Sequence, residues 1–337
     1  IATANQIEYF EKVFDLNSPI DSSDQIWQWK ELMTLITMIV AMIMLIPFSR
    51  FLLAQNIFNT LVKDVPKALP QQNKTSKIIF WIIFFLGAFI ASMSYIPMVD
   101  AAKVIFADAA NRELTWFYPQ RMNNSVMLWA AFNGVIGLIL FTGSYQFFGK
   151  KHGVSISSWG LEADIKYIAK TFGLALTVFA SYYALLFLIY YIFHVDYRFW
   201  FMGVRIFQPE MLLVLAMYAP IFFIFFFSNS LRVNGAMRIK GQAEWKSMLI
   251  AGVANSLGLF LIILLQYVTF ALTGTVFWTT NWLSVNLLFA IVPMMFVLPY
   301  FNRYFFYMTG RVYLGPMVTT LVFIMILSTN TVVYLPI

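Results

Sequence analysis

Three kinds of side chain that can act together in catalysis or ion binding lie close together in segment 194–198. This segment contains an imidazole, a carboxylate and a guanidinium. Such groups can move protons or bind a charged ligand when they share one loop. Together with an arginine from another connection predicted on the same side of the membrane, they form a candidate outer-loop cluster of His194, Asp196, Arg198 and Arg121. The alternative is an ordinary salt-bridge cluster at the membrane surface.

A second set of polar side chains consists of amides inside long apolar runs. Its members are Asn133, Asn255, Gln266 and Asn286. Amides in membrane helices most often hydrogen-bond to a neighbouring helix at modest gain. They can also line a cavity for a polar substrate, so these four residues define a candidate polar cavity. No Asp, Glu, Lys or Arg lies in the middle of a predicted span, which weakens the case for an ion-coupled transporter.

Several kinds of chemistry find no support in the residues present. The chain has no cysteine, so disulfides, thiolate metal sites and cysteine nucleophiles are excluded. His152 and His194 are predicted on opposite sides of the membrane, where they cannot share a metal ion, and His152 is expected to be a solvated loop residue. The basic connections 62–77 and 232–246 contain no phosphate loop and no paired metal ligands. We therefore predict no metal and no cofactor, and expect these connections to meet anionic lipid headgroups.

The elements that must position these residues are membrane helices. Of the 337 residues, 61% are hydrophobic and 11% are charged, whereas soluble domains have roughly 45–50% and 25%. Eight apolar runs reach the roughly 17–25 residues that cross the hydrocarbon layer as helix: 32–48, 78–98, 126–148, 172–193, 209–227, 248–272, 282–301 and 312–333. The predicted fold class is all-α, a polytopic transmembrane helix bundle of about eight spans over residues 31–337. An amphipathic segment precedes it over residues 1–30.

The distribution of basic residues predicts the orientation of this bundle, because lysine and arginine favour cytoplasmic loops. The odd-numbered connections contain fourteen of them: Arg50, Lys63, Lys67, Lys74, Lys77, Lys150, Lys151, Lys166, Arg232, Arg238, Lys240, Lys246, Arg303 and Arg311. The opposite side contains seven: Lys12, Lys30, Lys103, Arg112, Arg121, Arg198 and Arg205. We therefore expect a multi-pass protein of the cell membrane with both termini extracytoplasmic. These loops also account for the net charge of +7, so no nucleic acid partner is predicted.

Several motifs resemble a known arrangement. Segments 7–14, 19–20 and 25–31 look like the last helix of an extracytoplasmic α/β-hydrolase domain running into its first following membrane helix. The resemblance continues through 118–124, 193–200, Val233-Asn234-Gly235-Ala236, Thr329-Asn330-Thr331 and Tyr334-Leu335-Pro336. The chain thus resembles the membrane region of bacterial, Firmicutes-type proteins that fuse a serine-hydrolase domain to a multi-span carboxy-terminal region. The resemblance implies that the nucleophile, acid and histidine lie upstream of Ile1, and none of them is assigned in this chain.

The resemblance and the charge distribution favour one function and leave two alternatives open. The favoured interpretation is a membrane-embedded region that anchors an upstream extracytoplasmic serine-hydrolase domain and presents amphipathic substrates to it. Its expected partners are that domain and membrane lipids. The first alternative is a transport or export component for a small amphipathic molecule, which requires a polar-lined cavity at Asn133, Asn255 or Gln266. The second is a structural subunit of a membrane complex, with other membrane proteins as partners.

We expect Ile1 to face away from the cytosol in intact cells. An amino end on that side without its own export signal must follow an exported segment, which is the reason to expect an upstream domain. Labelling with an impermeant reagent, or protease access, measures this. Access to Ile1 only after lysis would contradict both the charge-based orientation and the favoured function.

Overall fold

The computed structural model describes residues 2–71, 73–150, 154–194, 197–199, 202–205 and 208–336. Within these residues, seven helices are long and apolar enough to cross a membrane, and a shorter apolar helix accompanies them. The prediction of an all-α polytopic membrane bundle is therefore confirmed.

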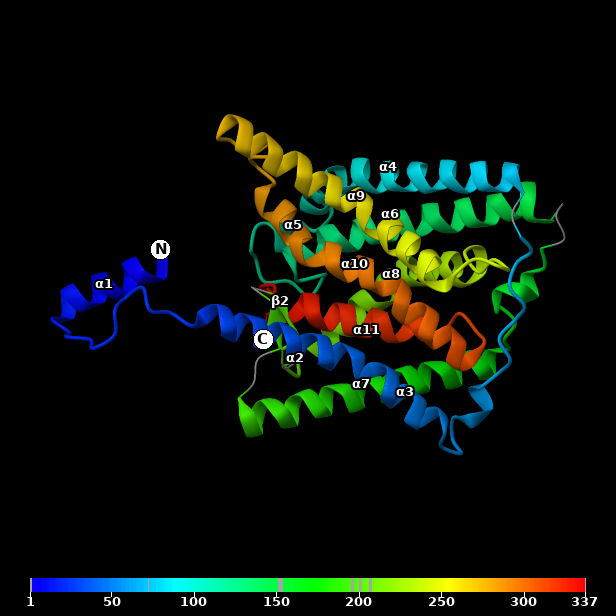
Figure 1. Ribbon diagram of the computed structural model, residues 1–337, viewed down its shortest axis with the longest axis horizontal. Coiled ribbons are helices and arrows are strands. Elements are labelled where there is room, and N and C mark those ends of the chain that lie inside the picture. The colour runs from blue at the N-terminus through cyan, green and yellow to red at the C-terminus, as the bar shows by residue number, and fades with distance from the viewer. Residues whose placement is uncertain are drawn as a thin grey trace.

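The spanning helices alternate in direction along the bundle (Figure 1). They are α2 (Trp27–Ile43) continued by α3 (Leu45–Leu53), α4 (Lys74–Ile105), α6 (Arg121–Ser144), α7 (Ile165–Phe193), α8 (Met211–Leu231), α9 (Glu244–Thr273), α10 (Trp282–Thr309) and the shorter α11 (Leu314–Thr329). Each overlaps one of the predicted apolar runs. Several are longer than their run, because polar residues at the run ends continue the helix beyond the hydrocarbon layer. Both ends of the chain lie at the same end of the bundle (Figure 1). Which membrane face this is stays a prediction.

Short elements precede the bundle or lie at its ends. They are α1 (Ala2–Phe14), η1 (Asn59–Leu61), α5 (Ala107–Ala110), η2 (Tyr145–Gly149), η4 (Ile156–Trp159), β1 (Arg198–Phe199), β2 (Met202–Gly203) and η5 (Arg232–Ala236). The strands pair antiparallel, with Arg198 opposite Gly203. Helix α1 stands away from the bundle (Figure 1), and Glu8 on it accepts a 2.9 Å hydrogen bond from Ser22 of the following linker.

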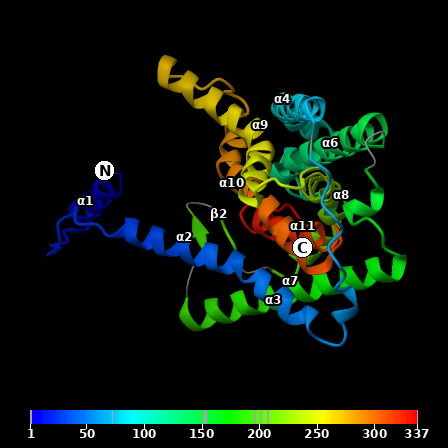
Figure 2. The ribbon, with the colours of Figure 1, turned by 45° about the vertical axis from the view of Figure 1, so that its right-hand side comes forward.

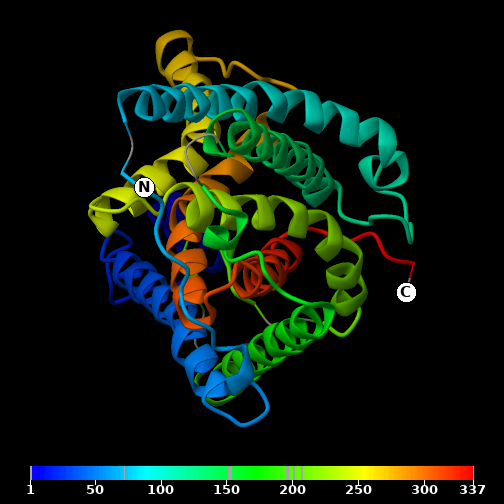
Figure 3. The ribbon, with the colours of Figure 1, turned by 90° about the vertical axis from the view of Figure 1, so that its right-hand side faces the viewer.

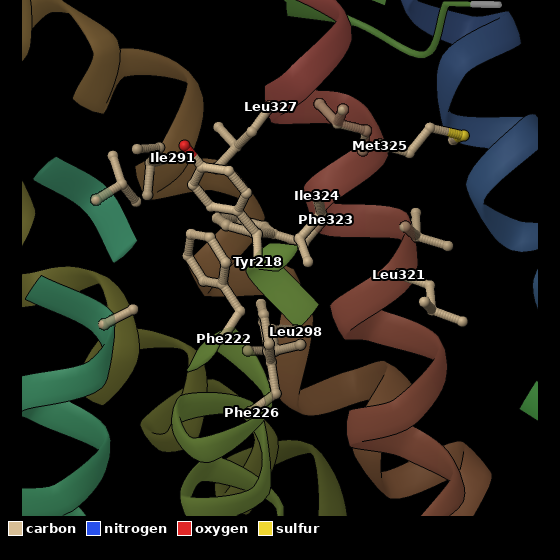
Figure 4. Packing of buried hydrophobic residues seen from close by; sticks show 14 of the residues in the cluster. Tyr218, Phe222, Phe226, Ile291, Leu298, Leu321, Phe323, Ile324, Met325 and Leu327 are labelled. Carbon is tan, nitrogen blue, oxygen red and sulfur yellow. The ribbon is translucent and has the colours of Figure 1, made fainter. Parts of the chain in front are cut away.

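Helix α11 forms the centre of the bundle. All its residues from Leu314 to Ser328 are buried, so it meets protein rather than lipid around its whole circumference. It packs against α7, α8 and α10 and is enclosed when the bundle is viewed along the helices (Figure 3). On one side the ring of Phe323 lies 5.4 Å from that of Phe222 and 5.1 Å from that of Phe226, both on α8 (Figure 4).

Helices α4, α6, α8 and α9 lie on the opposite side of α11 from α2, α3 and α7 (Figure 2). Two contacts among them depend on glycine. A Cβ on Gly258 of α9 would lie 2.7 Å from the carbonyl oxygen of Ala88 and 2.8 Å from the Cβ of Ala91, both on α4. A Cβ on Gly134 of α6 would lie 2.8 Å from the Cα of Phe225 on α8. The glycines therefore let these backbones approach closely, as small residues do in membrane bundles.

We expect Gly258→Leu to destabilise the bundle, because the added side chain must push α9 away from α4. Overpacking of this kind costs roughly 1–3 kcal/mol. Thermal unfolding of the purified protein, followed by the loss of monodisperse elution, measures the change. The matched control is Gly173→Leu in α7, where an added Cβ meets nothing within 4 Å. Equal melting temperatures for the two variants would contradict the close approach of α9 to α4.

Candidate functional site

A cavity of about 320 Å³ lies between α4, α6, α9 and the end of α8 with η5. One end is formed by Gln71, Asn73 and Ser76, at the start of α4. The other end lies deep in the bundle, at Ala91 and Trp129. Because Ala91 lies eighteen positions after Asn73, the N-cap of α4, the cavity extends over about 27 Å of helix. It therefore begins at the end of the bundle that carries the basic, odd-numbered connections and runs into the membrane interior.

The wall of this cavity is mostly apolar. Its aliphatic and aromatic members include Ile79, Phe80, Ile83, Phe84, Ile136, Leu140, Phe141 and Phe225. Space is left on α4 by Gly87, where an added Cβ would meet nothing within 4 Å. The deep end is fixed by Trp129, whose indole Nε1 donates a 2.9 Å hydrogen bond to the carbonyl of Ala91. An elongated, mostly apolar space with a few polar groups in its wall suits an amphipathic molecule.

The structure brings two of the four predicted amides into this cavity. Asn133 lines it and donates hydrogen bonds to Ser94 Oγ at 3.0 Å and to the carbonyl of Trp129 at 2.9 Å. Asn255 lines it from α9. The other two lie elsewhere and fill interhelical or loop contacts. They are Gln266, which accepts from the Trp278 amide at 2.8 Å, and Asn286, which accepts from Tyr267 at 2.8 Å.

A chain of side-chain amides joins three helices at the polar part of the cavity. Asn302 Nδ2 donates to Asn229 Oδ1 at 2.9 Å, and Asn229 Nδ2 donates to Asn255 Oδ1 at 2.5 Å. Arg232 also donates to Asn255 Oδ1 through Nη2. Since a guanidinium cannot accept a hydrogen bond, the carbonyl of Asn255 must face it and the amide nitrogen must face away. Arg232 Nε and Asn255 Nδ2 are buried and have no hydrogen-bond partner among the described residues.

Arg232 is the only charged side chain among the described residues that line this cavity. The described ion pairs involve other residues: Arg303 with Glu244 at 2.8 Å, Arg198 with Glu31 at 3.1 Å, and Lys103 with Asp100 at 2.7 Å. Our sequence analysis missed Arg232 because it assigned this residue to a connection at the membrane surface. Arg232 follows Asn229 by three residues, so both lie on one face if the helix continues. This spacing could have indicated that Arg232 faces the interior of the bundle.

The expectation that connection 232–246 meets lipid headgroups is wrong for Arg238, and Arg303, from the next connection predicted to be cytoplasmic, is buried as well. Arg238 is 6% exposed and Arg303 is 3% exposed. Arg303 donates to the Val233 carbonyl at 2.6 Å, and Arg238 donates to the Asn234 carbonyl at 3.0 Å. Both carbonyls belong to the π-helical turn η5, so the guanidiniums bind backbone acceptors that this irregular turn presents. These two arginines therefore hold in place the turn η5, whose first residue is Arg232.

The charge of Arg238 is retained in this buried position. Burial, followed by the nearby positive charge of Arg303, lowers the pKa of Arg238 to about 10. The group is therefore still protonated at neutral pH. Its Nη2 donates to the Ser158 carbonyl at 2.8 Å, so it joins η5 to the connection between α6 and α7.

The residues of the candidate outer-loop cluster lie in different surroundings. His194 ends α7 in a left-handed conformation, with its ring 6.1 Å from that of Tyr190. Arg198 of β1 pairs with Glu31 on α2, a partner that the sequence analysis did not predict. Arg121 lines a separate cavity of about 30 Å³ together with Lys103. Asp196 lies outside the described residues, as does His152.

The part of the chain that the structure describes contains no set of side chains suited to bind a metal ion. No group of three His, Asp or Glu side chains there could hold a metal ion. The cavity with Arg232 is therefore the site with the most distinctive chemistry in the described residues.

Comparisons with protein-family models, with curated proteins and with solved structures find no match to this chain, so its function is inferred from this geometry.

Proposed function

We propose that this multi-span membrane protein binds a small amphipathic molecule in the cavity between α4, α6, α8 and α9, as a step in its transport or export. The cavity itself is the observation that supports this proposal. Its volume of about 320 Å³ is within the roughly 300–1,000 Å³ typical of ligand sites. Asn133 and Asn255 line it rather than packing only against neighbouring helices, which is what the transport interpretation requires.

The depth of the cavity supports uptake from one side of the membrane. Its polar end is formed by residues of the first and fifth connections, which are predicted to be cytoplasmic. Its deep end closes at Trp129, which is 1% exposed. A molecule entering with its apolar part first would therefore rest with that part inside the bundle and its polar part near Asn255. Release to the other side requires α4, α6 or α9 to move.

We expect a cysteine at Gly87 to react with a small polar thiol reagent, and an amphiphile to protect it. The chain has no cysteine of its own, so Gly87→Cys carries the only thiol. The protein is placed in phosphatidylcholine vesicles and treated with neutral 2-hydroxyethyl methanethiosulfonate, with and without dodecyl phosphate. Modification is measured by mass spectrometry. Dodecyl phosphate should slow the reaction at least tenfold, because its chain fills the space beside Gly87.

The matched control for this experiment is Gly173→Cys, a helical glycine with equally open surroundings outside the cavity. Its reaction rate should not change with the amphiphile. A second variant, Gly87→Leu, should fold normally, since leucine favours helix over glycine by roughly 0.5–1 kcal/mol. A thiol at Gly87 that is unreactive, or equally reactive with and without amphiphile, would remove the support for a ligand cavity.

The second candidate function is the membrane anchor of an extracytoplasmic serine hydrolase, as the resemblance implies. The observation that favours it is the position of α1, which lies outside the bundle (Figure 1). Its exposed apolar residues include Ile7, Tyr9, Phe10, Val13 and Phe14. Such a helix is suited to pack against a preceding folded domain or to lie in the membrane interface. The two functions are compatible, because a bundle that binds an amphiphile could supply it to a hydrolase.

For this second candidate we expect the coding region upstream of Ile1 to supply an exported segment and a serine on a glycine-flanked strand-turn-helix elbow. The complete product in native membranes should then react with a fluorophosphonate probe, as activated serines do. Gel fluorescence at the mass of the complete product measures this, and heat-denatured membranes serve as the control. An initiator methionine directly before Ile1 would contradict the anchor function and leave the cavity proposal intact.

A further inference from the structure

We infer that the molecule bound in the cavity carries an anionic group, a phosphate or a carboxylate, that pairs with Arg232. This inference rests on the proposed function, because it names the class of ligand for the same cavity. It draws on the charge balance of the wall, the hydrogen-bond donors left unpaired and the shape of the apolar space.

The charge balance of the wall calls for an anion. Arg232 is the only charged side chain among the described lining residues, and its guanidinium stays protonated at physiological pH. A charge in apolar surroundings is costly unless an opposite charge or strong acceptors compensate it. Asn255 offers one neutral acceptor. The nearest acidic residue along the following helix, Glu244, is already paired with Arg303.

The unpaired donors match the acceptors of a phosphate or carboxylate. Arg232 Nε and Asn255 Nδ2 are both buried and lack a partner among the described residues. Their orientation is fixed, because Asn255 Oδ1 is held by Arg232 on one side and by Asn229 on the other. A guanidinium beside an amide N–H donor can bind two oxygens of one oxyanion with charge-assisted hydrogen bonds. The amide chain therefore positions both donors before any ligand arrives.

The apolar part of the cavity excludes a free inorganic anion as the best-fitting ligand. The wall from Ile79 to Trp129 is aliphatic and aromatic over most of its length. A small anion at Arg232 would leave this space unfilled, whereas an attached alkyl or prenyl chain would fill it and bury its apolar surface there. The volume of about 320 Å³ is at the lower end of the range for ligand sites and favours a single chain.

The test compares ligands that share a chain and differ in charge. Protection of Gly87→Cys from 2-hydroxyethyl methanethiosulfonate is titrated with dodecyl phosphate, dodecanol and inorganic phosphate. We expect dodecyl phosphate to protect at a concentration at least tenfold lower than dodecanol, and inorganic phosphate not to protect. The neutral reagent is used so that Arg232 does not attract or repel it.

The same titration with Arg232→Gln added should abolish the tenfold preference for dodecyl phosphate over dodecanol. Arg232→Lys should keep part of it, since the positive charge remains. The control is Lys240→Gln, which removes an exposed positive charge from the same connection but does not line the cavity. It should keep the full preference. Monodisperse elution confirms that each variant is folded. If a substitution at Arg232 prevents folding, the comparison of the three ligands on Gly87→Cys with Arg232 intact still tests the inference.

The outcomes separate the inference from the function on which it rests. Equal protection by dodecyl phosphate and dodecanol, or a preference unchanged in Arg232→Gln, would overturn the anionic ligand and leave an amphiphile-binding cavity. Protection by inorganic phosphate as effective as by dodecyl phosphate would assign the site to a free anion and overturn the amphiphile. Protection by none of the three would overturn the cavity proposal and the inference together.

Discussion

The interior of a membrane offers no water to backbone amides and carbonyls, and each of these groups must find its partner within the protein. Long helices satisfy them internally, which explains why most of the described chain between Trp27 and Thr329 is helical. The constraint becomes informative where the regular pattern ends. At η5 the helix widens into a π turn, and Arg303 and Arg238 donate to its carbonyls. The turn and the arginines therefore stabilise one another.

The candidate site depends on that irregular turn. Arg232 is its first residue, so the position of this guanidinium is set by a turn that two other guanidiniums hold in place. Arg238 and Arg303 repel each other, and Arg303 is relieved by Glu244 while Arg238 donates to carbonyl oxygens. Arg232 receives only amide contacts among the described residues. The site thus combines rigid support with an incomplete charge balance, which is the arrangement expected where a ligand supplies the missing charge.

Small residues explain why a cavity exists at this place. The contact at Gly258 draws α9 against α4, and the contact at Gly134 draws α6 against α8. Between these contacts α4 presents Gly87 and Ala88, which are too small to fill the space that remains. Small side chains thus have two effects here. They let the helices pack closely at Gly258 and Gly134, and they leave the space beside Gly87 and Ala88 open.

The number and approximate positions of the spans could be predicted from the sequence, because long apolar runs have few other ways to be stable. Of the four amides proposed from the sequence, two line the cavity, and the sequence alone indicates only that an amide in an apolar run must face protein or a cavity. Which of the two applies depends on helix rotation, and this separates Asn133 and Asn255 from Gln266 and Asn286. The pairing of Arg198 with Glu31 joins segments far apart in sequence, and no local pattern encodes it. Arg232 was missed because counting basic residues by loop treats every arginine near a helix end as solvated.

The enclosure of α11 also bears on biogenesis. This helix follows the other described helices in the chain and leaves the ribosome after them, yet it occupies the axis around which they pack. Until it arrives, the faces of α7, α8 and α10 that pack against it lack their partner. Quality control acting on nascent chains would therefore meet a bundle without its central helix, and a chain that lacks residues 314–337 would lose this helix while keeping the seven longer ones.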